Sequence, residues 1–81
     1  MRHSQAGTPV KRSVTLAGHR TSISLEAAFW DALQHIALAQ NKSVNGLICE
    51  IDAARPTTGK QAGGLSSAVR IYVLAWYRDG A

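Results

Sequence analysis

The sequence contains one long region in which apolar and polar residues alternate, over residues 11–25. Alternation with period two is typical of a half-buried β-strand. The apolar positions change from even to odd numbers inside the region, so one residue must be absorbed between the two halves. Gly18 is the expected place for this, as a bulge or a turn, and the pattern leaves open one kinked strand or two short strands. The apolar positions are Val14 and Leu16, followed by Thr21, Ile23 and Leu25.

Two amphipathic helices are expected next. The first covers residues 26–40, where apolar residues recur at helical spacing, and Asn41 can adopt the left-handed conformation that ends a helix. Ser43 is expected to cap the second helix with its hydroxyl group. The apolar stripes consist of Phe29, Leu33, Ile36 and Ala37 in the first helix and Val44, Leu47, Ile48 and Ile51 in the second.

A third helix is expected near the end of the sequence. Residues 54–64 contain one proline and three glycines and predict a loop, after which Ser66 or Ser67 is positioned to cap a helix that reaches Tyr77. Over residues 69–77 this helix is apolar almost all round. Such a helix is normally buried on several sides, which in so small a domain implies a partner chain.

The size of the chain also favours a dimer. With 81 residues it forms one domain, and so short a chain buries only about 60% of the surface of its unfolded form. Cys49 is the only cysteine and cannot form an internal disulfide, yet 46% of the residues are hydrophobic. Oligomerisation is the remaining common way to complete a small core. The sequence contains no secretory or membrane-spanning segment, which predicts a cytoplasmic protein.

The positive charge is concentrated near the start of the sequence. Residues 1–20 contain four basic and no acidic residues, whereas the rest contains five of each (5 − 5 = 0), so the whole net charge of +4 lies there. Such a segment favours a polyanionic partner, although a solvated tail would have the same composition. We expect a disordered basic arm over 1–10, one domain over 11–77 and a tail over 78–81. The four basic residues are Arg2, Lys11, Arg12 and Arg20.

The order of these elements resembles a known superfamily, and two runs of sequence resemble one of its families. The runs are KRSVTLAGHRTSISLEAAFWDAL at residues 11–33 and LSSAVR at residues 65–70. They are similar to small bacterial ribbon–helix–helix proteins, of the superfamily that includes the Arc and MetJ regulators. The resemblance implies a mostly α fold with one short β-strand per chain and an additional C-terminal helix. It also implies an intertwined homodimer, in which an intermolecular antiparallel ribbon of two strands enters the DNA major groove.

The resemblance and the alternation together select residues that contact bases. Over residues 20–25 the apolar side chains pack on the helices, so the polar side chains face outward and, by resemblance, read base edges. Arg20 is the strongest candidate, because a guanidinium group pairs with guanine O6 and N7 through two hydrogen bonds. An alternative phase, in which Arg12, Ser13 and Thr15 supply this face, stays open. The predicted base-reading residues are Arg20, Ser22 and Ser24.

Contacts to DNA phosphates are expected at two places. The run NKSVNGLI at residues 41–48 resembles the turn and helix start at which this superfamily holds a phosphate, through free N–H groups and the positive end of the helix dipole. The basic residues at the start of the strand are expected to contact phosphates without reading sequence. The predicted phosphate-binding residues are Lys11, Arg12, Lys42, Ser43, Val44 and Asn45.

The expected function is that of a homodimeric transcriptional repressor, which binds a pseudo-palindromic operator and controls its own promoter. The same hypothesis allows two dimers to bind side by side on tandem half-sites. It also predicts that the protein associates with the nucleoid when it is bound to DNA. Two alternatives stay open: an antitoxin that represses its own operon, and a protein-interaction module that has lost DNA binding. The predicted dimer core consists of Ile23, Leu25, Phe29, Leu33, Leu47, Ile48, Ile51 and Trp76.

No enzymatic activity, metal or cofactor is expected. The residues around Gly59 and Lys60 do not match a phosphate-binding loop motif, because Ala54 stands where that motif requires a glycine. His3, His19 and His35 lack the spacing of metal ligands. No pairing of a nucleophile with a base, and no pair of carboxylates, stands out in the sequence.

Overall fold

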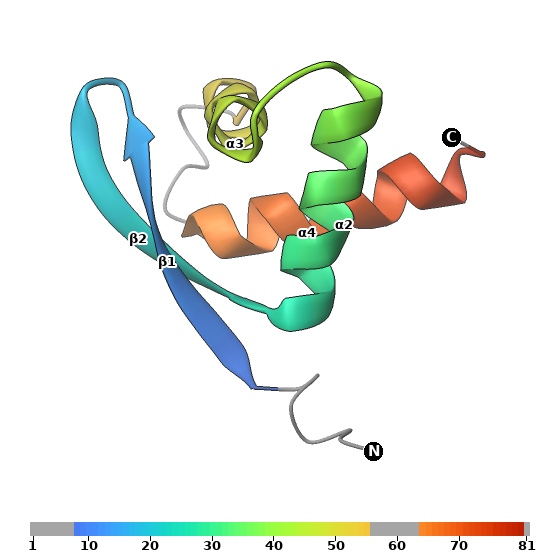
Figure 1. Cartoon of the computed structure of the whole chain (residues 1–81), viewed down its shortest axis with the longest axis horizontal. Helices are drawn as coiled ribbons and strands as arrows, with labels where there is room; N and C mark the ends of the chain where they lie inside the picture. The colour runs from blue at the N-terminus through green and yellow to red at the C-terminus, as the bar shows by residue number, and fades with distance from the viewer. Residues whose placement is uncertain (1–7, 56–63, 81) are drawn as a thin grey trace.

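The chain folds into a hairpin of two strands followed by three helices (Figure 1). This computed structural model describes residues 8–55 and 64–80. The hairpin runs along one side, and each helix contacts one of its strands. The expected mostly helical fold with an additional C-terminal helix is confirmed. The elements are β1 (Pro9–Leu16), β2 (His19–Glu26), α2 (Ala27–Ala39), α3 (Val44–Ala53) and α4 (Gly64–Arg78).

The alternating region forms two antiparallel strands, not one. Ala17 and Gly18 form the turn between them, with φ angles of 51° and 82°, and positive φ angles at both turn residues match the twist of a hairpin. The prediction of one short strand per chain is therefore wrong in number, because this turn reverses the chain. The antiparallel ribbon of the structure lies within a single chain, and an intermolecular ribbon stays a prediction. β1 begins at Pro9, before the expected start at Lys11, and residues 1–7 lie outside the described residues.

The turn explains why the apolar positions switch from even to odd numbers. Residues directly opposite each other share a face of the hairpin, and in this register each pair combines an even with an odd number. The inner face carries the buried Val14, Ile23 and Leu25 and packs on the helices. We call the opposite, polar side the outer face; between the turn and the end pair of Pro9 and Glu26 it consists of Lys11, Ser13, Thr15, Arg20, Ser22 and Ser24.

The junction between α2 and α3 follows the predicted local chemistry. Asn41 has a φ angle of 61°, so it adopts the left-handed conformation after α2. The Ser43 hydroxyl oxygen accepts a hydrogen bond from the Gly46 N–H at 2.9 Å and caps α3. Both predictions are confirmed. The predicted stripe of α3 faces inward, with Leu47, Ile48 and Ile51 buried and Val44 half-buried.

α4 begins earlier and is less buried than predicted. It starts at Gly64, and Ser66 lies inside the helix, where its hydroxyl group donates to the Ser24 carbonyl at 3.2 Å. One face of α4 packs into the core, but Ile71 and Leu74 are 67% and 60% exposed. Burial of this helix on several sides is therefore not achieved within a single chain.

The core draws on all five elements of one chain. Six of the eight residues predicted for a dimer core are buried in it, and Phe29 and Trp76 are partly buried against it. Their contact with a second chain stays a prediction. No helix in the described part of the chain is long and apolar enough to cross a membrane. The buried residues are Val14, Ile23, Leu25, Trp30, Leu33, Ile36, Ala37, Leu47, Ile48, Ile51, Val69 and Val73.

Candidate nucleic-acid interface

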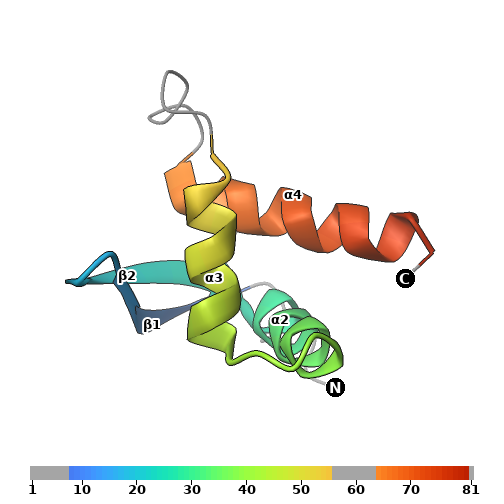
Figure 2. The same ribbon diagram turned by 90° about the horizontal axis from the view of Figure 1, so that it is seen from above.

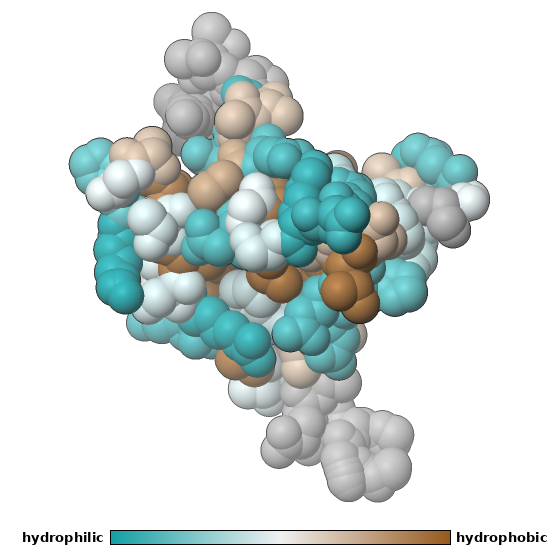
Figure 3. All heavy atoms as spheres, turned by 45° about the horizontal axis from the view of Figure 1, so that its top comes forward, coloured by the Kyte–Doolittle hydropathy of each residue, from teal (hydrophilic) through white to brown (hydrophobic). Residues whose placement is uncertain are grey.

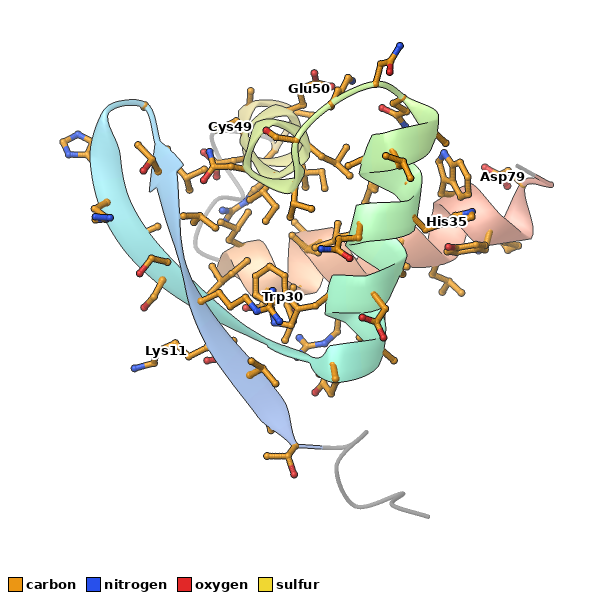
Figure 4. All side chains as sticks on the ribbon, viewed as in Figure 1. Lys11, Trp30, His35, Cys49, Glu50 and Asp79 are labelled. Atoms are coloured by element: carbon orange, nitrogen blue, oxygen red, sulfur yellow. The ribbon has the colours of Figure 1, made fainter. Side chains whose placement is uncertain are left out.

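The outer face of the hairpin is polar and carries two positive charges; at its far end Glu26 lies opposite Pro9, and its carboxylate pairs with Arg70. Thr15 lies opposite Arg20, Ser13 opposite Ser22, and Lys11 opposite Ser24. All of these residues except the half-buried Ser24 are exposed. Lys11 points away from the helices (Figure 4), and on the face shown in the space-filling view hydrophobic residues reach the surface between hydrophilic ones (Figure 3). The outer face therefore presents hydroxyl and cationic groups, which can bind the base edges and phosphates of a nucleic acid.

The outer face contains residues from both sets that the sequence left open as alternatives for base reading. Ser13 and Thr15 lie on the same face as Arg20, because the two-residue turn brings odd positions of β1 opposite even positions of β2. Arg12 lies on the inner face. The sequence left one or two strands open, and the change of phase around Gly18 was the signal for this combination.

Arg12 lies beside the start of α3. Its guanidinium carbon is 5.1 Å from the centroid of the Trp30 ring, and the Trp30 Nε1–H donates to the Val10 carbonyl at 2.9 Å. The Trp30 side chain reaches from α2 toward the hairpin (Figure 4), and its ring packs against the Arg12 guanidinium group. A pocket of about 210 Å³ opens here; it is lined by Arg12, Ser13, Val14, Trp30, Gln34, Val44 and Asn45.

The pocket brings a cationic group next to a helix N-terminus. The first N–H groups of a helix have no partner within it, and the helix dipole makes this end positive. Two predicted phosphate-binding residues, Val44 and Asn45, line the same pocket as Arg12. Lys42 does not join them, because its Nζ pairs with Glu50 Oε1 at 2.5 Å.

Asn45 has a structural role that the sequence did not reveal. Its side-chain Oδ1 accepts from the Thr15 N–H at 2.9 Å, and its Nδ2 donates to the Thr15 carbonyl at 3.0 Å. The Cys49 Sγ–H donates to the same carbonyl at 3.1 Å. The side chain of Asn45 thus makes the two backbone hydrogen bonds that a neighbouring strand would make with Thr15. It ties the start of α3 to β1, directly across from Arg20.

These hydrogen bonds also define the two edges of the hairpin. In an antiparallel pair, bonded and non-bonded residue pairs alternate. Because the N–H and C=O of Thr15 point to Asn45, the pairs of Thr15 with Arg20 and of Ser13 with Ser22 are non-bonded. The backbone groups of Arg20 and Ser22 therefore point away from β1. Within residues 8–55 and 64–80, no hydrogen bond reaches them, and we call this stretch the open edge of β2.

The far end of the β2 edge is covered by α4. The Arg70 guanidinium donates two hydrogen bonds to the Glu26 carboxylate, at 3.1 and 3.2 Å, and lies 5.7 Å from the centroid of the Phe29 ring. A hydrogen bond from the Glu26 backbone and those from Arg70 hold the pKa of the Glu26 carboxyl below its ordinary value. This ion pair fixes α4 at the point where β2 passes into α2.

Comparison with known proteins identifies a family whose model matches this chain. The model of a family described as a ribbon-helix-helix domain matches residues 9–77. The solved structure of an uncharacterised protein from Bordetella pertussis Tohama I is similar, with a TM-score of 0.75 and 26% sequence identity over 95% of this chain. The chain covers 62% of the length of that protein. A search of curated proteins gave no match.

Proposed function

The chain belongs to the ribbon-helix-helix domain family, and we propose that it binds double-stranded DNA sequence-specifically as a homodimer and represses transcription. Proteins with this domain are typically DNA-binding transcription regulators. The observation that carries the proposal is the outer face of the hairpin, where Lys11 and Arg20 stand among four hydroxyl residues. A face with this composition matches the acceptors of base edges and phosphates in the major groove.

The open edge of β2 supports pairing with a second copy of the chain. Two β2 strands can pair antiparallel about a two-fold axis through the backbone groups of Arg20 and Ser22. The combined sheet would have four strands, in the order β1, β2, β2 of the partner subunit, β1 of the partner subunit. Such a dimer would bind a pseudo-palindromic operator, because the symmetry of the site mirrors that of the protein.

The width of this sheet assigns different roles to its strands. With strands about 4.8 Å apart, the outer two lie roughly 14 Å from each other, which exceeds the groove width of about 12 Å. The central β2 strands would therefore enter the groove with Arg20, Ser22 and Ser24. The flanking β1 strands would lie over the groove walls, where Lys11 meets phosphates. Arg12 and the N–H groups of Val44 and Asn45 would contact phosphates further out.

The test is a selection of bound sequences from random DNA, repeated at two salt concentrations with wild-type protein, Arg20→Ala and Lys11→Ala. Arg20→Ala should weaken binding to the selected site by about 10- to 100-fold and relax the preference at one base pair. Lys11→Ala is the matched control: it should weaken binding to all sequences alike and reduce the salt slope by about 1. Unchanged affinity and preference in Arg20→Ala would contradict the proposal.

A further inference from the structure

Two unpartnered features lie on the same side of the molecule. β2 and α4 occupy one side, and β1 and α2 occupy the other (Figure 2). On the first side lies the open edge of β2, whose backbone groups have no partner among residues 8–55 and 64–80. α4 exposes Ile71 and Leu74, with exposed fractions of 67% and 60%. Large apolar side chains grouped on one helix face mark a surface that binds another molecule more often than isolated ones do.

The two features form one continuous surface. Ser66, Arg70 and Leu74 are spaced four residues apart and therefore form one row along α4. The first two members of this row bond to β2, to the Ser24 carbonyl and the Glu26 carboxylate. The row thus begins at the β2 edge and leads to Leu74. Ile71 lies three residues before Leu74, on the adjoining strip of the helix.

Ile71 also lines an apolar groove between α3 and α4. The groove has a volume of about 510 Å³ and is lined mainly by Leu47, Ile51, Ala54, Ala68, Ile71 and Tyr72. Exposed apolar side chains beside an apolar groove suit a two-fold interface. In such an interface the same surface of each subunit contacts that of the other. The row of one copy can then enter the groove of the other.

We propose that a second copy of this chain covers this surface, so that α4 forms the apolar part of the interface in which the β2 edges pair. This inference rests on the proposed function, which requires a homodimer. The two residues of each open β2 edge cannot supply a stable interface, because specific interfaces bury about 1,200–2,000 Å² in total. The apolar face of α4 adjoins that edge and supplies the missing area.

The test compares two charge substitutions on exposed apolar residues by sedimentation equilibrium. The double variant Ile71→Lys with Leu74→Lys should raise the dissociation constant of the dimer by about 100-fold or more, because four apolar side chains per dimer lose their burial. Leu38→Lys is the matched control: Leu38 is 80% exposed but belongs to α2 and not to α4. It should leave the dissociation constant unchanged. Circular dichroism should show all variants folded, and the milder pair Ile71→Ser with Leu74→Ser should weaken the dimer less.

The outcomes separate this inference from DNA binding. A wild-type protein that is monomeric at every concentration, or a lysine double variant that dimerises like wild type, overturns the role of α4. Equal weakening by Leu38→Lys does the same, since the effect would then not belong to one surface. A dimer that depends on Ile71 and Leu74 but binds no DNA supports the inference and contradicts the proposed function instead.

Discussion

The two edges of the hairpin differ in what completes them. The β1 edge is occupied from within the chain at Thr15, where Asn45 bonds to both the N–H and the C=O of that residue. The β2 edge is covered by α4 only at its far end, through Ser24 and Glu26. Between Arg20 and Ser22 it stays open in the described part of the chain.

This difference shows how a small domain can direct its own association. An exposed strand edge pairs readily with any other strand, and proteins limit this by covering or interrupting the edge. Here the side chain of Asn45 occupies the β1 edge at Thr15, and Ser66 of α4 occupies the β2 edge at Ser24, so pairing along each edge is confined to part of the strand.

The largest effect is expected from blocking the open edge. Ser22→Pro removes an N–H that points away from β1, so the hairpin should survive, because proline is tolerated on the free side of an edge strand. Pairing between two β2 strands would lose two hydrogen bonds by symmetry, and we expect dimerisation to weaken by about 100-fold. Sedimentation equilibrium measures this.

The control uses the residue directly opposite. Ser13→Pro makes the same change on β1, where the N–H also points away from the partner strand. It should leave dimerisation unchanged, because that edge is not the pairing edge. Equal dimerisation of the two proline variants would show that the edges do not differ in association.

The next largest effect is expected from removing the contact of Asn45 with the β1 edge. Asn45→Ala removes both hydrogen bonds to Thr15, and we expect it to lower the free energy of unfolding by about 1–3 kcal/mol. Asn45→Asp should lower the free energy of unfolding by less, because its carboxylate still accepts from the Thr15 N–H although it cannot donate to the Thr15 carbonyl. Urea denaturation measures both variants. An alanine variant as stable as wild type would mean that Asn45 does not hold β1.

Much of the fold follows from local chemistry that the sequence displays. The left-handed Asn41, the Ser43 cap and the inward stripe of α3 were predicted correctly, because each depends on residues within one or two turns of helix. The choice between one kinked strand and two short strands stayed open for a related reason. Ala17 has a φ angle of 51°, which an alanine rarely adopts, so the sequence lacks the usual signal of a hairpin turn.

The links that shape the candidate interface depend on long-range contacts. Asn45 and Thr15 are 30 residues apart, and Arg70 and Glu26 are 44 apart. No spacing rule predicts such pairs, since they form only after the helices pack on the hairpin. The alternation of β2 did predict which side chains face outward. The structure adds Ser13 and Thr15 to that face, because the register of the hairpin fixes their partners.

The smallest effect is expected at the covered end of the β2 edge, where pH tests the ion pair between Glu26 and Arg70. The pKa of Glu26 lies below its ordinary value of 4.5, so the folded state binds this proton less readily than the unfolded state. The pair therefore stabilises the fold fully above that ordinary value, and its contribution is lost as the pH falls through the lowered pKa. Glu26→Gln should reduce the urea midpoint slightly near neutral pH and should match wild type in strong acid, because both side chains are then uncharged. The decisive measurement is the difference between the two midpoints as a function of pH, which cancels the titration of all other groups. A difference that stays constant down to strong acid would show that the charge of Glu26 does not hold α4 against the end of β2.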